Sequence, residues 1–155
     1  LDEEQQRAFE ELDEQHQALN RRSEEFHDSR RQADVNRQRE EMGNRLAEFE
    51  EEAERRRSEE GEHFDEEWYE FERSMIERRI ELDGRRIEIE ENFDRKRKEL
   101  SNSPAGQDQQ AWERLDEEQQ RAFEELDEQH QALNRRSEEF HDSRHEEDED
   151  HEEDE

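Results

Sequence analysis

The sequence lacks most of the residues that interrupt or cross-link a chain. It has no cysteine, so neither disulfide bonds nor thiolate chemistry is available. It has one proline and four glycines in 155 residues, and this scarcity favours long uninterrupted helices. No apolar run approaches the length needed to span a bilayer, so we expect no membrane insertion. None of these absences identifies a cellular compartment.

Apolar residues are scarce as well. Leu, Ile, Val and Phe together supply 22 of the 155 residues, and the net charge is −30, a combination that by itself is typical of disordered chains. A two-helix coiled coil needs only about two apolar residues in seven, and the hydrophobic fraction of 23% nearly reaches that level. The composition therefore predicts an all-α protein of long amphipathic helices that are marginal alone and stable when paired.

Charge and motif content exclude several classes of function. The excess of 55 acidic over 25 basic residues should repel nucleic acid and anionic membranes, so no nucleic-acid partner is expected. The sequence contains no nucleophile–base constellation, no glycine-rich phosphate loop and no dinucleotide motif. We therefore predict no enzyme activity, no catalytic residues and no cofactor.

One segment of thirty residues occurs twice, letter for letter. Residues 1–30 and residues 115–144 both read LDEEQQRAFEELDEQHQALNRRSEEFHDSR. Self-similarity of this kind is typical of structural arrays, in which the chain would comprise one unit of 114 residues and part of the next. A second interpretation stays open, namely that the duplication is artificial or that the chain is a piece cut from a tandem array.

The duplicated segment carries a narrow stripe whose members step by three and four residues, which is the a/d spacing of a coiled-coil seam. The stripe contains Phe9, Leu12, His16, Leu19, Ser23 and Phe26 in the first copy, and Phe123, Leu126, His130, Leu133, Ser137 and Phe140 in the second. His16 and His130 are predicted to set the register of pairing at some cost in stability. Because imidazoles become charged as the pH falls below about 6.5, pairing is expected to weaken in mild acid.

Glycines predict where the first helix is irregular. We expect one long charged helix over residues 1–100, because this stretch lacks proline and is rich in Glu–Arg pairs four residues apart. The apolar stripe slips near Gly43 and Gly61, and glycine costs about 1 kcal/mol in a helix relative to alanine. Bends or short interruptions are therefore predicted near residues 31–44 and 57–63.

The clearest break in the sequence is Ser-Asn-Ser-Pro-Ala-Gly at residues 101–106, a combination that ends a helix and makes a turn. Residues 107–144 then predict a second helix, which Ser103 or Asp108 would cap. A connection this short between helices favours an antiparallel helical hairpin.

The positions of apolar residues in the two predicted helices support such a hairpin. Residues 64–100 are the most apolar part of the chain, and folding about Pro104 brings their apolar positions opposite those of the second copy. The predicted pairs are Phe93 with Leu115, Leu82 with Leu126, Met75 with Leu133, and Trp68 with Phe140. The predicted helix-pairing seam comprises these eight residues together with Phe9, Leu12, Leu19, Phe26, Ile89 and Phe123. We interpret Trp68, Tyr69 and Phe71 as packing residues rather than as a ligand-stacking site.

The end of the chain holds the only candidates for metal chemistry. His141 and His145 are four residues apart, as in zinc-binding helices, but Asp stands where the catalytic Glu of that motif belongs, and Arg31 replaces the second His after the first copy. We therefore favour a solvated helix end and predict no metal site. Residues 145–155 hold nine carboxylates and no basic residue, which predicts a disordered acidic tail that binds divalent cations only weakly.

These observations predict a structural or scaffolding coiled-coil protein that self-associates through helix pairing, as part of a tandem-repeat filament. Because residues 1–30 duplicate the proposed partner of the apolar middle, the two copies should compete for it, and exchange between chains would link them into rings or filaments. The expected partner is another copy of the chain or another coiled-coil protein.

Two alternatives remain open from the sequence. The acidic helices or tail would form a binding module for basic proteins or Ca²⁺, or the chain would be a single charged helix used as a spacer. Salt discriminates the first alternative from the scaffold, because apolar pairing survives high salt whereas capture by charge is lost.

Overall fold

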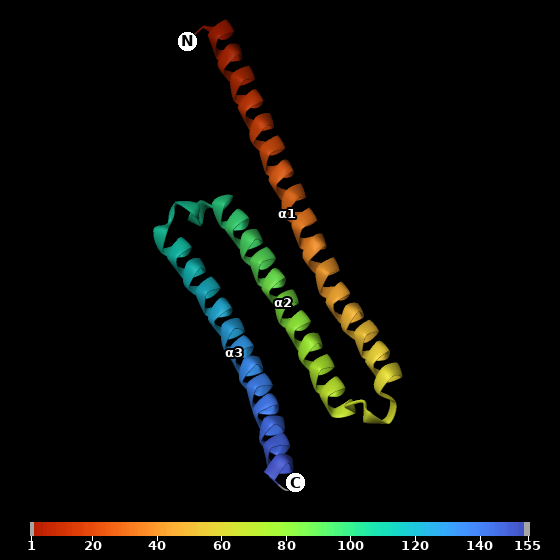
Figure 1. The fold of residues 1–155 in the computed structure, drawn as a ribbon. Coiled ribbons are helices and arrows are strands. Elements are labelled where there is room, and N and C mark those ends of the chain that lie inside the picture. The colour runs from red at the N-terminus through yellow and green to blue at the C-terminus, as the bar shows by residue number, and fades with distance from the viewer. Residues whose placement is uncertain (1, 154–155) are drawn as a thin grey trace. The chain divides into compact units, whose positions relative to one another are not determined.

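The computed structural model describes the backbone of residues 2–153 and the side chains of residues 2–147. Its elements in order are α1 (Glu3–Glu60), a 3₁₀ turn η1 (Gly61–His63), α2 (Glu66–Ser101), a 3₁₀ turn η2 (Pro104–Gln107) and α3 (Gln109–Glu153) (Figure 1). The prediction of an all-α protein whose helices pack against one another is confirmed for the described residues.

The chain divides into two compact units, residues 1–41 and residues 42–155. The first unit contains most of α1, and all the described residues from 2 to 30 are exposed. The second unit contains the last turns of α1, all of α2 and α3, and the packed core.

Helix α1 continues through residues 31–44, where the sequence predicted a bend or a short interruption. Gly43 lies within the helix, and its φ is not positive. A helical glycine costs about 1 kcal/mol, which its Arg, Glu and Gln neighbours, all good helix formers, offset over several turns. The glycine therefore weakens the helix without breaking it.

The break after α1 falls at Gly61–His63 and reverses the direction of the chain, within residues 57–63 where a bend or short interruption was predicted. Gly61 adopts the left-handed conformation with φ of 56°, which ends α1 as glycine commonly does just beyond a helix. Asp65 then caps α2, because its Oδ1 accepts a hydrogen bond from the Trp68 N–H at 3.0 Å. Phe64 before the cap contacts Tyr69 with ring centroids 6.0 Å apart, in the positions of a hydrophobic staple.

The turn between α2 and α3 is closed by side-chain and backbone hydrogen bonds. Ser103 donates from both its N–H and its hydroxyl to the Leu100 carbonyl, at 3.2 and 2.9 Å. The Trp112 indole N–H donates to the Gly106 carbonyl at 2.9 Å. Asp108 caps α3 by accepting from the Gln110 N–H at 3.0 Å. This turn brings α2 and α3 side by side (Figure 1).

The predicted acidic tail begins within α3, which extends to Glu153. The structure does not describe the side chains of residues 148–153 or any part of residues 154–155. Most of the predicted disordered tail, residues 145–155, therefore lies outside the described residues.

Candidate functional site: a helix-pairing surface

The α2–α3 interface is the best-packed surface of the second unit. Met75 and Leu82 of α2 form a buried cluster with Leu126 and Leu133 of α3, and Leu82 has no exposed surface. Phe71 and Ile89 extend this cluster along α2 as half-buried neighbours. The seven-residue spacing within each helix places these side chains on one face, so a few apolar residues make a continuous seam.

The register of this seam differs in part from the one predicted. Phe140 stacks on Phe71, with ring centroids 3.8 Å apart and planes inclined by 12°, instead of facing Trp68. Trp68 contacts Phe49 of α1, with a centroid separation of 5.8 Å. The physical reason lies in the connection, because η2 extends to Gln107 and delays the start of α3 to Gln109.

Polar side chains flank the seam on both sides. Arg85 donates a hydrogen bond to Gln129 at 2.9 Å, and Arg97 donates one to Gln119. Lys96 pairs with Glu118 at 3.7 Å. These partly exposed contacts contribute little energy each, but they penalise a shifted register because the charged groups would lose their partners.

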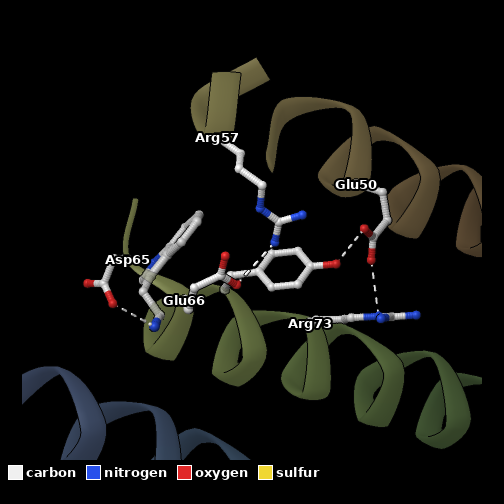
Figure 2. A network of polar contacts seen from close by, with 7 residues as sticks. Glu50, Arg57, Asp65, Glu66 and Arg73 are labelled. Atoms are coloured by element: carbon white, nitrogen blue, oxygen red, sulfur yellow. Dashed lines mark hydrogen bonds and ion pairs between the residues drawn. The ribbon is translucent and has the colours of Figure 1, made fainter. Parts of the chain in front are cut away.

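The last turns of α1 pack on a second face of α2. The rings of Phe49 and Tyr69 stack with centroids 5.8 Å apart and planes 7° from parallel. Glu50 accepts the Tyr69 hydroxyl at 2.6 Å and pairs with Arg73 at 3.0 Å, and the Arg57–Glu66 pair at 3.1 Å lies nearby (Figure 2). The hydrogen bond to the Glu50 carboxylate is the largest of the effects that raise the pKa of Tyr69.

Sequence reasoning assigned no pairing residue to this part of α1. Met42 and Ala53 are buried there, at 6% and 2% exposure, and Phe49 and Leu46 are half-buried. The signal was present, since Met42, Leu46, Phe49 and Ala53 step by four, three and four. What the sequence did not reveal was the reversal at Gly61 that gives this stripe a partner.

The predicted seam residues of the second copy and of α2 lie at or near the packed interface. Phe93 and Leu115 are buried, at 5% and 8% exposure, near the turn. Trp68, Ile89, Phe123, His130 and Phe140 are half-buried. Ala122 and Gln129 are half-buried as well, so the seam of α3 lies slightly to one side of the predicted stripe and leaves Phe123 and His130 at its edge.

The predicted seam residues of the first copy lie in a different environment. Phe9, Leu12, Leu19 and Phe26 are 61%, 50%, 62% and 58% exposed, and His16 is exposed too. Their counterparts in the second copy are buried or half-buried. Phe9, Leu12 and His16 line a shallow open groove, and the equivalent groove of the second copy is bordered by Arg86 of α2. The same thirty-residue sequence thus forms an uncovered seam in residues 1–30 and a covered seam in residues 115–144.

Of the two histidines His141 and His145 in α3, His141 takes part in packing contacts. His141 Nε2 lies 3.2 Å from a Glu72 carboxylate oxygen, and its ring meets Phe71 edge-on with centroids 6.4 Å apart. Among the described residues no group of three His, Cys, Asp or Glu side chains is arranged to hold a metal ion. Within the same residues no helix has the length and apolarity to cross a membrane.

Comparisons with protein-family models, with curated proteins and with solved structures gave no match. The surface must therefore be interpreted from its own geometry.

Proposed function

We propose that the protein is a structural, self-associating helical scaffold, and that residues 1–30 are its association surface. The observation that carries this proposal is the exposure of Phe9, Leu12, Leu19 and Phe26, at 50–62%, on a segment whose exact duplicate packs against α2. Regularly spaced apolar side chains on one helix face are typical of a surface that a partner helix covers. The net charge of −30 would limit unspecific aggregation of such a surface.

Sedimentation velocity over a wide range of concentration tests the proposal. In physiological salt the intact chain should form species heavier than the 19.3 kDa monomer as its concentration rises. The double variant Leu12→Gln/Leu19→Gln should remain monomeric, because each substitution removes an apolar anchor from the seam. A chain that stays monomeric at every concentration would contradict the proposal.

A matched control separates the seam from the helix that carries it. Glu14→Gln/Arg21→Gln changes two residues on the opposite face of the same helix and leaves the net charge unchanged. This control should associate like the intact chain. Equal loss of association in both double variants would mean that pairing is not specific to the seam face, and no loss in either would place the surface outside residues 1–30.

Salt separates the scaffold from a binding module that acts through its charge. Residues 1–30 contain ten acidic residues and four arginines, so screening should preserve or strengthen their pairing with an identical segment. Association with a basic protein, in contrast, should be lost in high salt.

A further inference from the structure

We propose that residues 1–30 pair with the same segment of a second chain. The two segments run antiparallel about the midpoint between Gln17 and Ala18. This inference rests on the proposed function and makes it specific, because it names the partner and its direction. The resulting dimer would have a twofold axis through the centre of the segment.

The number of pairing surfaces in one chain argues against an arrangement in which the first copy of one chain replaces the second copy on the α2 of another. Each chain has two copies of the segment and one face of α2 that packs against a copy. If residues 1–30 of one chain replaced residues 115–144 on the α2 of another, a displaced copy would be left uncovered. Exchange therefore covers no more apolar surface than the closed hairpin does, whereas pairing between two first copies covers both.

The charge distribution within the segment selects the antiparallel direction. Residues 1–15 contain seven acidic residues and one arginine, and so carry −6. Residues 16–30 contain three acidic residues and three arginines, and so carry no net charge with neutral histidine. An antiparallel pair places each acidic half beside a neutral half, whereas a parallel pair places the two acidic halves together. Like charges held side by side oppose pairing.

The seam positions agree with the same direction. About this midpoint Phe9 lies level with Phe26 of the partner chain, and Leu12 lies level with its Ser23. Leu19 lies level with His16 of the partner chain, so each polar seam residue meets an aliphatic one. A parallel pair in register would instead stack His16 on His16 and Ser23 on Ser23. Polar residues in the seam cost stability and fix alignment, so their placement decides between the two directions.

The second copy offers a precedent for the polar contact that would flank this pair. Gln129, the equivalent of Gln15, accepts a hydrogen bond from Arg85 of α2 at 2.9 Å. In the antiparallel dimer Gln15 lies beside Arg22 of the partner chain, on the flank of the seam. The same glutamine would thus meet an arginine in both environments.

Cysteine cross-linking tests the direction, because the natural chain has no cysteine. Chains carrying Gln15→Cys are mixed with chains carrying Arg22→Cys and treated with a short bifunctional thiol reagent. The antiparallel dimer should give more covalent dimer from this mixture than from either variant alone. The mixed pair is offset by only about 3 Å along the axis, whereas the two copies of position 15 lie about 7.5 Å apart and the two copies of position 22 about 13.5 Å apart. Glu14→Cys, which points outward, supplies the background level.

Two further variants identify the competing arrangements. Ser23→Cys alone should form a disulfide between chains only in a parallel pair, since antiparallel pairing separates the two sulfurs by about 16 Å along the axis. A mixture of Gln15→Cys with Arg85→Cys chains should cross-link only if the first copy replaces the second on α2. Either product in place of the Gln15–Arg22 product would overturn the antiparallel pair.

Sedimentation of the same samples before cross-linking keeps the two proposals apart. A monomer at all concentrations contradicts the proposed function itself, and the inference with it. A dimer that cross-links through Ser23→Cys or Arg85→Cys contradicts the inference alone. Circular dichroism of each variant should match that of the intact chain, so that a loss of cross-linking reports geometry and not unfolding.

Discussion

Leu12 and Leu126 occupy the same position of an identical thirty-residue sequence, yet Leu12 is 50% exposed whereas Leu126 is 6% exposed. The difference comes from α2, whose Met75 and Leu82 cluster with Leu126. Local sequence is held constant in this comparison, so any difference in behaviour between the two leucines measures the effect of tertiary packing.

The first prediction uses this pair directly. Leu126→Ala should lower the free energy of unfolding by about 2 kcal/mol or more, because it leaves a cavity against Met75 and Leu82. Leu12→Ala should change it by less than about 0.5 kcal/mol in dilute protein, because the side chain is exposed there. Urea unfolding followed by circular dichroism measures both. Equal effects of the two substitutions would mean that the hairpin is not the stable part of the chain.

The second prediction concerns the turn between α2 and α3. A Cβ atom at Gly106 would lie 2.5 Å from the Leu100 carbonyl oxygen and 3.2 Å from that of Ser101, and both obstacles are backbone atoms. Gly106→Ala should therefore destabilise the hairpin and lower its thermal midpoint. Gly84→Ala is the matched control, because a Cβ there meets nothing within 4 Å and lies inside α2. That control should stabilise the protein by about 0.5–1 kcal/mol.

The third prediction separates two roles of Asp65. This residue caps α2 through the Trp68 N–H and also pairs with Arg144 of α3. Asp65→Asn keeps a capping oxygen and loses the ion pair, whereas Asp65→Ala loses both. Asp65→Ala should therefore be less stable than Asp65→Asn by about 1 kcal/mol.

Arg144→Gln provides the complementary measurement for that pair. It removes the ion pair and leaves the cap, so its unfolding midpoint in urea should match that of Asp65→Asn. An Asp65→Ala variant no less stable than these two would show that the cap contributes nothing.

The fourth prediction is a pH dependence at the α1–α2 contact. The Tyr69 hydroxyl donates to the Glu50 carboxylate, and this bond raises the pKa of the phenol above its usual value. A raised pKa favours the protonated phenol in the folded chain, so the contact stabilises the fold below about pH 10 and stops doing so as the pH rises through the raised pKa. Absorbance of tyrosinate reports the titration, since Tyr69 is the only tyrosine.

The substitution Glu50→Gln tests whether the Glu50 carboxylate raises the pKa of Tyr69. It removes the negative charge and keeps the size of the side chain, so the titration midpoint of Tyr69 should move down toward that of free tyrosine. An unchanged midpoint would mean that another group raises it.

The part of the fold that sequence reasoning predicted best is the one with local signals. Ser101, Asn102, Ser103 and Pro104 stand together, and the structure ends α2 at Ser101 and begins η2 at Pro104. The antiparallel pairing of α2 with α3 was predicted from apolar residues that recur at matching positions before and after that turn. The exact register did not, because it depends on how many residues the 3₁₀ turn consumes before Asp108 caps α3.

The reversal after α1 was predicted only as a bend or short interruption, although its signals are local too. Gly61 is followed four residues later by Asp65 and then by Glu66 and Glu67, which is the pattern of a helix end and a new helix start. A glycine inside a charged helix gives a similar letter pattern, as Gly43 does within α1. The two cases differ in φ, which is positive at Gly61 alone among the described residues and which the sequence does not reveal.

The exposure of the first copy could not be predicted from its letters, because the buried second copy has the same letters. Sequence reasoning included both stripes in the predicted helix-pairing seam and predicted that the two copies compete for the apolar middle of the chain. The structure distributes them between a packed face and an uncovered one, and this difference is a property of position along the chain.

The short connection over residues 102–108 therefore has a role that no side chain in the seam can have. Within the thirty shared residues α2 meets the same chemistry from either copy, so affinity cannot distinguish them. The length of the connecting segment does distinguish them, because a shorter connection gives a higher effective concentration of the tethered copy. The second copy is joined to α2 by a few residues, whereas the first copy is joined to it by several tens of residues. Lengthening this connection would leave the side-chain contacts of the α2–α3 seam intact and still weaken the preference for the second copy.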